Sequence, residues 1–209
     1  MFKNWEEHPI YIDDPLKFLQ ESCPEDSFEL LRSCSIDDAK VPPYFIEEYN
    51  GCCVNAAACL ISSVTADGED FNKILASCKK TAENGYSRLK NGVVDYYTRL
   101  GSEASFLRRC LSMFTAGFSA RSSLFVKRRA LKEIEAQRPI LLNIAFSRQY
   151  IDHTVTAYGY EEYRSAKTGR RRLFFKIRDG YCMGVRYLEY RKIYGISATF
   201  LKLFTQNSH

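Results

Sequence analysis

Two adjacent cysteines at the start of a small, apolar stretch are the residues best suited to chemistry. Residues 50–61 read NGCCVNAAACLI, an Asn-Gly turn followed by residues typical of a buried helix. A thiol in the first turn of a helix is favoured as thiolate by the positive end of the helix dipole and by unpaired backbone N–H groups. The same N–H groups can receive the negative oxygen of a tetrahedral intermediate. The stretch therefore indicates either a nucleophile at Cys52 or Cys53, or two small buried hydrophobic residues.

His153 is the histidine with a context for acid–base chemistry. It begins the segment HTVTAYGY, whose composition predicts a strand, and Asp179 ends the next predicted strand just before Gly180. Read singly, His153 is a core or surface histidine and Asp179 is a turn residue. If the two strands pair as a hairpin, however, the start of one lies beside the end of the other. A carboxylate beside the imidazole can then fix its tautomer and stabilise its protonated form.

The other cysteines and histidines have simpler interpretations. Cys59, Cys78 and Cys110 are predicted to be small buried hydrophobic residues in helices. No Cys-x-x-Cys pair occurs among the eight cysteines, and His8 and His209 lie near the ends of the sequence, so we expect no metal site and no cofactor. The N-terminus lacks the pattern of a secretory signal. We therefore expect free thiols in a reducing, cytoplasmic compartment.

The composition is that of an ordinary globular protein. The 209 residues are 45% hydrophobic and 26% charged, which suits a substantial core. The net charge of +5 allows an acidic partner without requiring one. Basic runs at 127–129 and 169–172 are explained by a solvated helix face and a charged hairpin tip, so no nucleic-acid partner is expected. No stretch of about 18 apolar residues occurs, and we expect no membrane span.

The first part of the chain has the pattern of helices. Asp14 followed by Pro15 predicts a helix from residue 15 onward, and Pro24 predicts a second one over the residues that follow it. Small apolar residues predict a buried helix over 53–64. Three further helices are predicted, over residues 67–83, 86–101 and 126–137.

The pattern changes after Pro139. Segments rich in β-branched and aromatic residues predict five strands, over residues 139–146, 153–163, 171–179, 184–190 and 196–204. The charged stretch 165–171 is predicted to be a hairpin tip. A helical first half and an antiparallel second half make an α+β layout. Two prolines after Val41 mark a boundary, so we expect an N-terminal helical extension over 1–40 and a main domain over 41–209.

Together, the order Cys, His, Asp and the strings around these residues resemble the papain-like cysteine peptidases, in particular the bacterial branch related to bacteriocin-leader peptidases. In that branch the nucleophilic cysteine is followed by small residues of a buried helix, to which CVNAA at 53–57 is similar. The family's histidine opens a strand that ends in Gly-Tyr or Gly-Phe, as HTVTAYGY does. The string DGYCMGVRYLEY resembles the segment of its Asp or Asn. The resemblance extends from residue 41 to about residue 204.

The resemblance implies a papain-like fold and cleavage of a peptide or protein substrate through a thioester. It implies Cys53 as the nucleophile, His153 as the general base and acid, and Asp179 as the residue that orients the histidine. The Gln that the family carries before its cysteine is absent, and two glutamates stand there instead. Asn50 is the nearby neutral amide, so it would bind the oxyanion together with the backbone N–H of Cys53. No metal or cofactor would take part.

Two other functions stay open at this point. The same triad serves acyl transfer to an amine, as in transglutaminases, which would make the protein a transferase. An inactive papain-like domain would be a binding module, and the missing Gln is consistent with that reading. Thiol reactivity separates an active site from an inactive one, because a catalytic thiolate reacts well below the ordinary thiol pKa of about 8.5.

Overall fold

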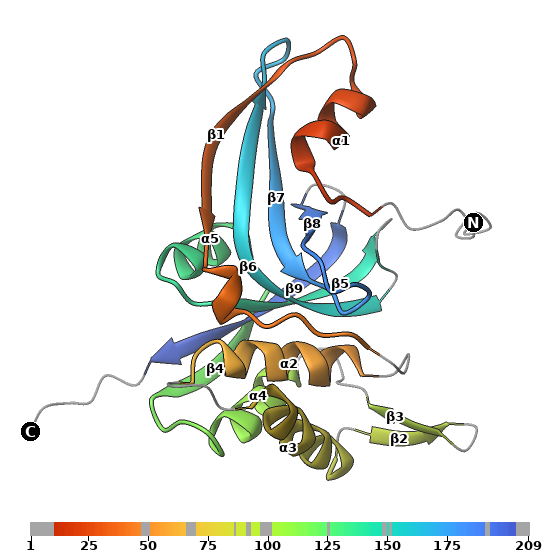
Figure 1. Ribbon diagram of the computed structural model, residues 1–209, viewed down its shortest axis with the longest axis vertical. Coiled ribbons are helices and arrows are strands. Elements are labelled where there is room, and N and C mark those ends of the chain that lie inside the picture. Colours follow the sequence, from red (N-terminus) through yellow and green to blue (C-terminus); the bar gives the residue numbers. More distant parts are fainter. Residues whose placement is uncertain are drawn as a thin grey trace, which may run out of the picture.

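Helices and one large antiparallel sheet make up this computed structural model (Figure 1). The structure describes residues 11–46, 51–65, 70–85, 87–90, 93–96, 102–124, 126–147, 150, 152–190 and 193–203. Its α-helices are α1 (Pro15–Ser22), α2 (Cys52–Ser62), α3 (Phe71–Glu83), α4 (Glu103–Leu111) and α5 (Lys127–Glu135), and a short 3-10 helix covers Asp38–Lys40. Its strands are β1 (Phe28–Ser35), β2 (Ser87–Lys90), β3 (Val93–Tyr96), β4 (Phe118–Ser123), β5 (Ile140–Ser147), β6 (Asp152–Ser165), β7 (Arg171–Arg178), β8 (Arg186–Glu189) and β9 (Ile193–Leu203). The α+β class predicted from the sequence is confirmed.

The long strand β6 is the centre of the sheet. The strand order is β4-β9-β5-β6-β7-β8, and β1 pairs with β6 as well. Strand β5 pairs with the first half of β6, residues 152–157, and β1 pairs with its second half, residues 159–165. Strand β7 occupies the opposite edge. At Gly159 a Cβ would lie 3.0 Å from both the Cys34 oxygen of β1 and the Lys176 side chain of β7, so a larger residue would require these neighbours to shift.

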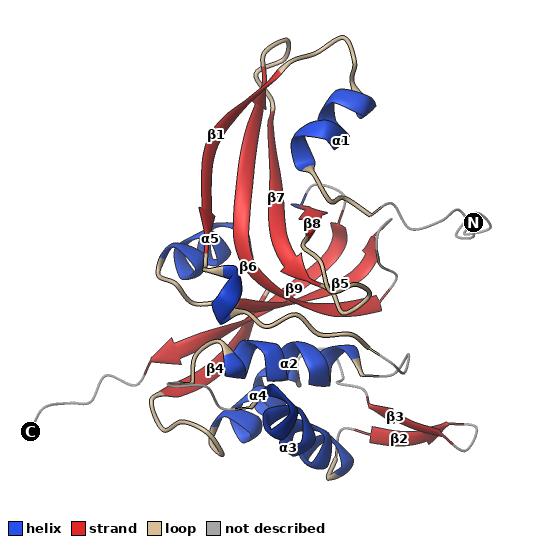
Figure 2. Ribbon diagram, viewed as in Figure 1, coloured by secondary structure: helices blue, strands red, loops and turns tan. Residues whose placement is uncertain are grey.

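Helices cover both faces of the sheet. Helices α2, α3 and α4 gather on one side (Figure 2), where they form a buried cluster with Leu141 of β5 and Tyr158 of β6. Helix α5 packs on the other face with Leu142 of β5 and Val155 of β6. Successive residues of a strand point to opposite faces, so the change from Leu141 to Leu142 separates the two cores.

Four predicted helices are confirmed. Helix α1 begins at Pro15, and the Asp14 side chain caps it by accepting from the Lys17 N–H at 3.0 Å. Helix α2 begins at Cys52, and its residues from Cys53 to Ile61 are all buried, as its apolar composition predicts. Helices α3 and α5 also lie where the sequence places them. The predicted helix at 86–101 is a different case.

Residues 86–101 were predicted to be helical, and the structure contradicts this. Residues 87–90 and 93–96 form the hairpin β2–β3, in which Lys90 pairs with Val93. The two intervening residues are Asn-Gly in the sequence, the strongest short signal for a tight hairpin. Apolar residues at helical spacing outweighed that signal in the prediction. Helix α4 and strand β4 were not predicted at all.

The predicted helix after Pro24 is also wrong. Phe28–Ser35 is strand β1, which pairs antiparallel with the second half of β6, and Arg32 binds Glu162 across the pair at 2.8 Å. This segment is a strand because it pairs with β6, which is distant in the sequence. A prediction from local propensity does not include such long-range pairing. Residues 1–40 are therefore not a wholly helical extension, because β1 belongs to the sheet of the main domain.

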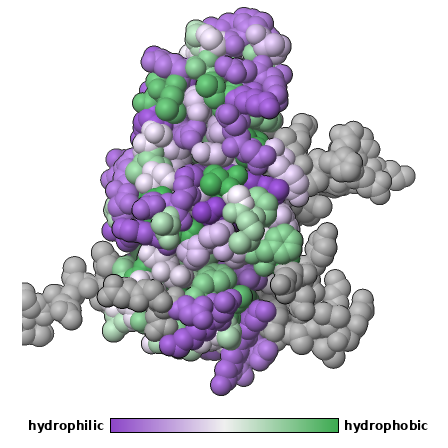
Figure 3. Space-filling view, in the orientation of Figure 1, coloured by the Kyte–Doolittle hydropathy of each residue, from purple (hydrophilic) through white to green (hydrophobic). Residues whose placement is uncertain are grey.

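The predicted strands of the second half are confirmed as β5 to β9. The hairpin tip at 165–171 is confirmed too, with Gly169 in the left-handed conformation at φ 67°. None of the described helices is both long enough and apolar enough to cross a membrane. The face of the molecule in Figure 3 is mostly hydrophilic, with apolar residues in small separate areas.

Candidate functional site

His153 and Asp179 lie side by side, where β6 begins and β7 ends. The His153 Nε2 atom is 2.6 Å from the main-chain oxygen of Asp179, and both residues are buried. A carbonyl oxygen only accepts hydrogen bonds, so Nε2 must carry a proton and donate it. In the neutral ring Nδ1 is then the basic nitrogen. The hairpin argument from the sequence thus predicted this neighbourhood.

The Asp179 carboxylate binds three other groups. Its Oδ2 atom accepts hydrogen bonds from the Tyr150 hydroxyl at 2.8 Å and from Arg186 Nη1 at 2.9 Å. Its Oδ1 atom accepts from the Tyr181 backbone N–H at 3.0 Å. The sequence predicted a contact between the Asp179 carboxylate and the His153 imidazole. In the structure the imidazole instead binds the main-chain carbonyl of Asp179. The carboxylate instead fixes the turn that follows β7.

Two tyrosine rings lie nearly parallel to the His153 ring. The Tyr150 ring centroid is 5.0 Å from that of His153, and the Tyr181 centroid is 4.5 Å from it. The Tyr181 hydroxyl is 3.4 Å from His153 Nδ1, which it reaches as a donor. Tyr150 is buried, and burial with the Asp179 charge raises its pKa, so it stays a neutral phenol. Tyr181 is 38% exposed, whereas the His153 ring stacked on it is buried.

Sequence reasoning missed both tyrosines as site residues. Tyr181 directly follows the Asp-Gly pair at the end of β7, a position that could have been noted. Tyr150 stands three residues before His153 in the connection between β5 and β6, where nothing in the local pattern marks it. Its role depends on the direction of its side chain, which tertiary structure decides.

The two cysteines occupy the first turn of α2, as predicted. The helix begins at Cys52, and Gly51 at the cap position has no side chain to bind the first N–H groups. The Asn55 side chain donates to the Gly51 carbonyl at 2.8 Å, which fixes the turn into the helix. The geometry of the first turn thus suits stabilisation of a thiolate or an oxyanion.

The thiols of Cys52 and Cys53 have different surroundings. Cys53 is 3% exposed and lies near Cys78 of α3. The pKa of the Cys78 thiol is raised first by its hydrogen bond with Cys110, then by burial and by the neighbouring Cys110 and Cys53. Cys53 therefore belongs to a cluster of thiols among the helices. Cys52 is partly exposed.

The spacing in α2 places Cys52 on the same helix face as Cys59, whose thiol interacts with Thr156 of β6. Residues 52, 56 and 59 are spaced four and three apart and share one helix face. On this face the Thr156 hydroxyl of β6 donates to the Ala56 carbonyl at 2.9 Å. Cys59 is fully buried, and burial raises its thiol pKa to about 12, with smaller opposing effects from Thr156 and Arg178. The prediction that Cys59, Cys78 and Cys110 are buried is confirmed.

Tyr44 connects the start of α2 with the end of β7. Its hydroxyl donates to the Arg178 carbonyl at 3.0 Å. Its pKa is raised by burial first, and then by the neighbouring Cys59, Asp179 and Cys52. The Tyr44 hydroxyl thus binds the residue just before Asp179, and Asp179 in turn contacts His153.

The chain beside Tyr44 follows the turn after β7 closely. The Ile46 N–H donates to the Gly180 carbonyl at 2.8 Å. Gly180 has φ 78°, and a Cβ there would lie 2.6 Å from Ile46 and from the Tyr44 ring. Only glycine allows both this backbone conformation and this approach.

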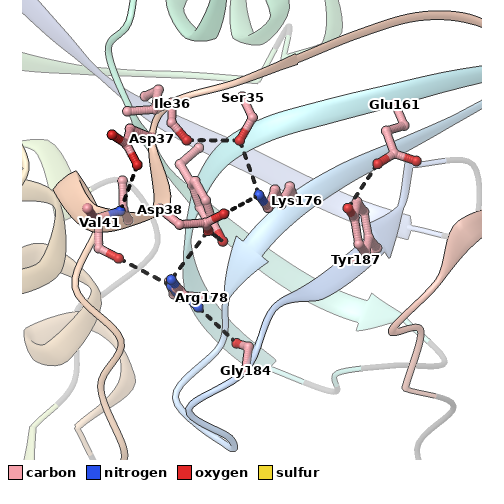
Figure 4. A network of polar contacts seen from close by, with 12 residues as sticks. Ser35, Ile36, Asp37, Asp38, Val41, Glu161, Lys176, Arg178, Gly184 and Tyr187 are labelled. Atoms are coloured by element: carbon pink, nitrogen blue, oxygen red, sulfur yellow. Dashed lines mark hydrogen bonds and ion pairs between the residues drawn. The ribbon is translucent and has the colours of Figure 1, made fainter.

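Arg178 holds the same turn from its other end. Its buried guanidinium donates to the Val41 carbonyl at 3.3 Å and to the Gly184 carbonyl at 3.2 Å, and it pairs with Asp38 at 3.4 Å (Figure 4). The segment before α2, the end of β7 and the turn that carries Tyr181 are therefore tied together. This network keeps the surroundings of His153 in one arrangement.

Asn50, expected to help bind an oxyanion, lies outside the described residues, as do the two glutamates that precede it. Within the described ranges, no group of three or more His, Cys, Asp or Glu residues is placed to hold a metal ion. The site is therefore defined by Cys52, Cys53, His153 and Asp179, together with the tyrosines that surround them.

No protein-family model matches this chain, and no curated protein matches its sequence. The function must therefore be inferred from the chemistry of the site itself. Its strongest elements are a basic imidazole nitrogen with a fixed tautomer at His153, and a buried helix that begins with two cysteines.

Proposed function

We propose that this protein is a cysteine peptidase of the papain-like kind that cleaves peptide bonds through a thioester. One observation carries the proposal: Asp179 holds His153 with Nδ1 as the basic nitrogen, and Tyr44, in the segment that leads to the two cysteines of α2, binds the carbonyl of the neighbouring Arg178. A thiol at a helix start, beside a histidine of fixed tautomer, is the arrangement that acyl transfer by cysteine requires.

We assign the nucleophile to Cys52 in this proposal. The string CVNAA favours Cys53 by its likeness to the family, but the Cys53 thiol is buried near Cys78. Cys52 is partly exposed. Exposure matters because a peptide carbonyl must reach the sulfur.

In the proposed reaction, His153 Nδ1 takes the proton of the Cys52 thiol. The thiolate attacks the carbonyl carbon of the scissile bond, and the backbone N–H groups of the first turn of α2 bind the oxyanion. The tetrahedral intermediate collapses, the C–N bond breaks, and His153 gives its proton to the leaving amine. Water then attacks the thioester, with His153 taking one of its protons. This step releases the carboxylic acid and restores the thiol.

The proposal is tested by the rate of iodoacetamide alkylation at each cysteine against pH, with labelled sites identified by mass spectrometry. We expect Cys52 to react fast at about pH 6–7, below the ordinary thiol pKa, and to lose this reactivity in His153→Ala. Cys53→Ala is the matched control and should leave the fast phase intact, whereas Cys52→Ala should abolish it.

If Cys53 shows the fast, histidine-dependent phase, the peptidase proposal stands and the nucleophile is reassigned. If no cysteine reacts fast at this pH, the proposal is wrong. A positive result is followed by cleavage of a peptide library, in which Cys52→Ala should release no new N-termini.

A further inference from the structure

The N-terminal segment lies directly against the residue that binds the Asp179 carboxylate. Ile12 forms an antiparallel bridge with Tyr187 of β8, and its carbonyl accepts from the Tyr187 N–H at 2.7 Å. Ile12 is buried in a small cluster with Leu19 of α1 and Phe174 of β7. The segment before α1 is therefore anchored to the sheet immediately beside Arg186, the first residue of β8.

Arg186 is held from several sides. Its Nη1 atom lies 2.9 Å from Asp179 Oδ2, and the Asp179 side chain is almost fully buried. The Tyr11 ring covers the guanidinium, with the ring centroid 3.7 Å from its central carbon. The Asp13 carboxylate lies 3.9 Å from Arg186 Nε. A cation covered by an aromatic ring is shielded from water, and its attraction to a buried carboxylate is strengthened.

Asp179 is the main influence that raises the pKa of Arg186. Burial lowers the pKa of Arg186, but the charge and hydrogen bond of Asp179 outweigh burial and raise it, with smaller contributions from Cys182 and Tyr150. Tyr150 shares Asp179 Oδ2 with Arg186. Arg186 thus binds the carboxylate of the residue that holds the imidazole, so a change at Arg186 should be detectable at His153.

We propose that Arg186 is a positioning residue for His153: it fixes Asp179, whose carbonyl holds the imidazole, and Tyr11 and Asp13 hold Arg186 in place. The N-terminal segment is thereby coupled to the candidate site. The coupling to His153 is a structural statement, and its importance for catalysis rests on the proposed peptidase function.

The test reads His153 directly, by NMR titration of the imidazole in the full-length protein. With three histidines in the chain, the His153 signal is identified by its absence from His153→Ala. In Arg186→Gln we expect the pKa of His153 to rise by on the order of one unit, because the carboxylate loses its cation and attracts the imidazolium. Arg186→Lys keeps the charge and should recover most of the native value.

Arg164→Gln is the matched control, since Arg164 pairs with Glu29 in an exposed position on β6. It should leave the His153 titration unchanged. Equal titrations in Arg186→Gln and Arg164→Gln would overturn the proposal. If Arg186→Gln does not fold, Tyr11→Ala decides: the pKa should rise by a few tenths of a unit in Tyr11→Ala and stay native in Tyr11→Phe, which keeps the ring. No shift in Tyr11→Ala overturns the coupling.

Alkylation of Cys52 in the same variants keeps the two proposals apart. A histidine shift without any fast-reacting cysteine in the native protein supports the coupling and rejects the peptidase function. A fast-reacting Cys52 with no histidine shift in any variant supports the peptidase function and rejects the coupling.

Discussion

The Nε2 atom of His153 donates to the main-chain oxygen of Asp179 at 2.6 Å, while the carboxylate of Asp179 binds Arg186. The imidazole is thus oriented by a backbone atom that every residue type possesses. The aspartate side chain acts on the histidine through charge and through the shape of the turn after β7. Loss of the carboxylate charge should therefore affect His153 less than it would if the carboxylate itself held the imidazole.

Asp179→Asn should weaken the reactivity of Cys52 without abolishing it. The carbonyl contact to His153 survives, and only the negative charge is lost, so we expect alkylation about tenfold slower at neutral pH, equivalent to about 1.4 kcal/mol. His153→Ala should be slower by at least about a hundredfold. The measurement is the alkylation rate by mass spectrometry, with circular dichroism as the check on folding. Equal losses in the two variants would contradict a backbone-held histidine.

Tyr181→Phe should make Cys52 more reactive. The Tyr181 hydroxyl donates to His153 Nδ1, the nitrogen that must take the thiol proton, so it competes with the thiol. Removing one hydrogen bond of about 1 kcal/mol should accelerate alkylation about fivefold near pH 7. The ring stacked on His153 remains in this variant, so burial is preserved. A slower reaction would show that the hydroxyl assists the histidine instead.

Gly180→Ala should destabilise the protein by about 2–3 kcal/mol. The new methyl group would meet Tyr44 and Ile46, and the residue would have to keep a positive φ. Gly169→Ala is the matched control, because φ is also positive there but no atom lies within 4 Å of the added Cβ. We expect it to cost about 1 kcal/mol. Urea unfolding measures both, and equal costs would refute the close approach at Gly180.

Glu162 should contribute stability that is lost in acid. Burial raises the pKa of its carboxyl, but hydrogen bonds from Arg32 at 2.8 Å and Lys127 at 3.2 Å outweigh burial and lower it below the usual 4.5. A group with a lowered pKa in the folded state stabilises above its unfolded pKa and loses that effect as the pH falls through its folded pKa. The difference in free energy of unfolding between the native protein and Glu162→Gln should therefore be largest at neutral pH. It should disappear below about pH 4.

Urea unfolding from pH 3 to 7 measures this difference. Glu29→Gln serves as the control, because Glu29 pairs with Arg164 on the surface, where an ion pair contributes little. A difference that widens on acidification would contradict the ion pairs at Glu162.

Cys59 should resist alkylation in the folded protein. Burial raises its thiol pKa to about 12, and its Sγ atom lies 3.3 Å from the Pro42 carbonyl. Iodoacetamide at about pH 8.5 should therefore label Cys59 only after unfolding in urea, whereas Cys52 should be labelled natively. Comparable native rates for Cys52 and Cys59 would mean that the face of α2 toward β6 is open to solvent.

Local signals in the sequence were sufficient for several elements. Asp14 before Pro15 located α1, the apolar run after Gly51 located α2, and the alternating, β-rich segments after Pro139 located five strands. These elements follow from capping, periodicity and turn residues, which act over a few positions. Hairpin logic also placed His153 beside Asp179, because a short connection forces two strands to be neighbours.

Tertiary structure alone decided the rest. Strand β1 forms because β6 is long enough to pair with two partners on one edge. The local sequence of Phe28–Ser35 gives no sign of this pairing. The thiols of Cys52 and Cys53 diverge because successive helix positions point in different directions, and only packing determines which direction meets the sheet. The Asp179 carboxylate binds the full charge of Arg186, while the main-chain oxygen of the same residue binds His153. These hydrogen-bond partners are brought together by the tertiary fold and cannot be read from the order of residues in the sequence.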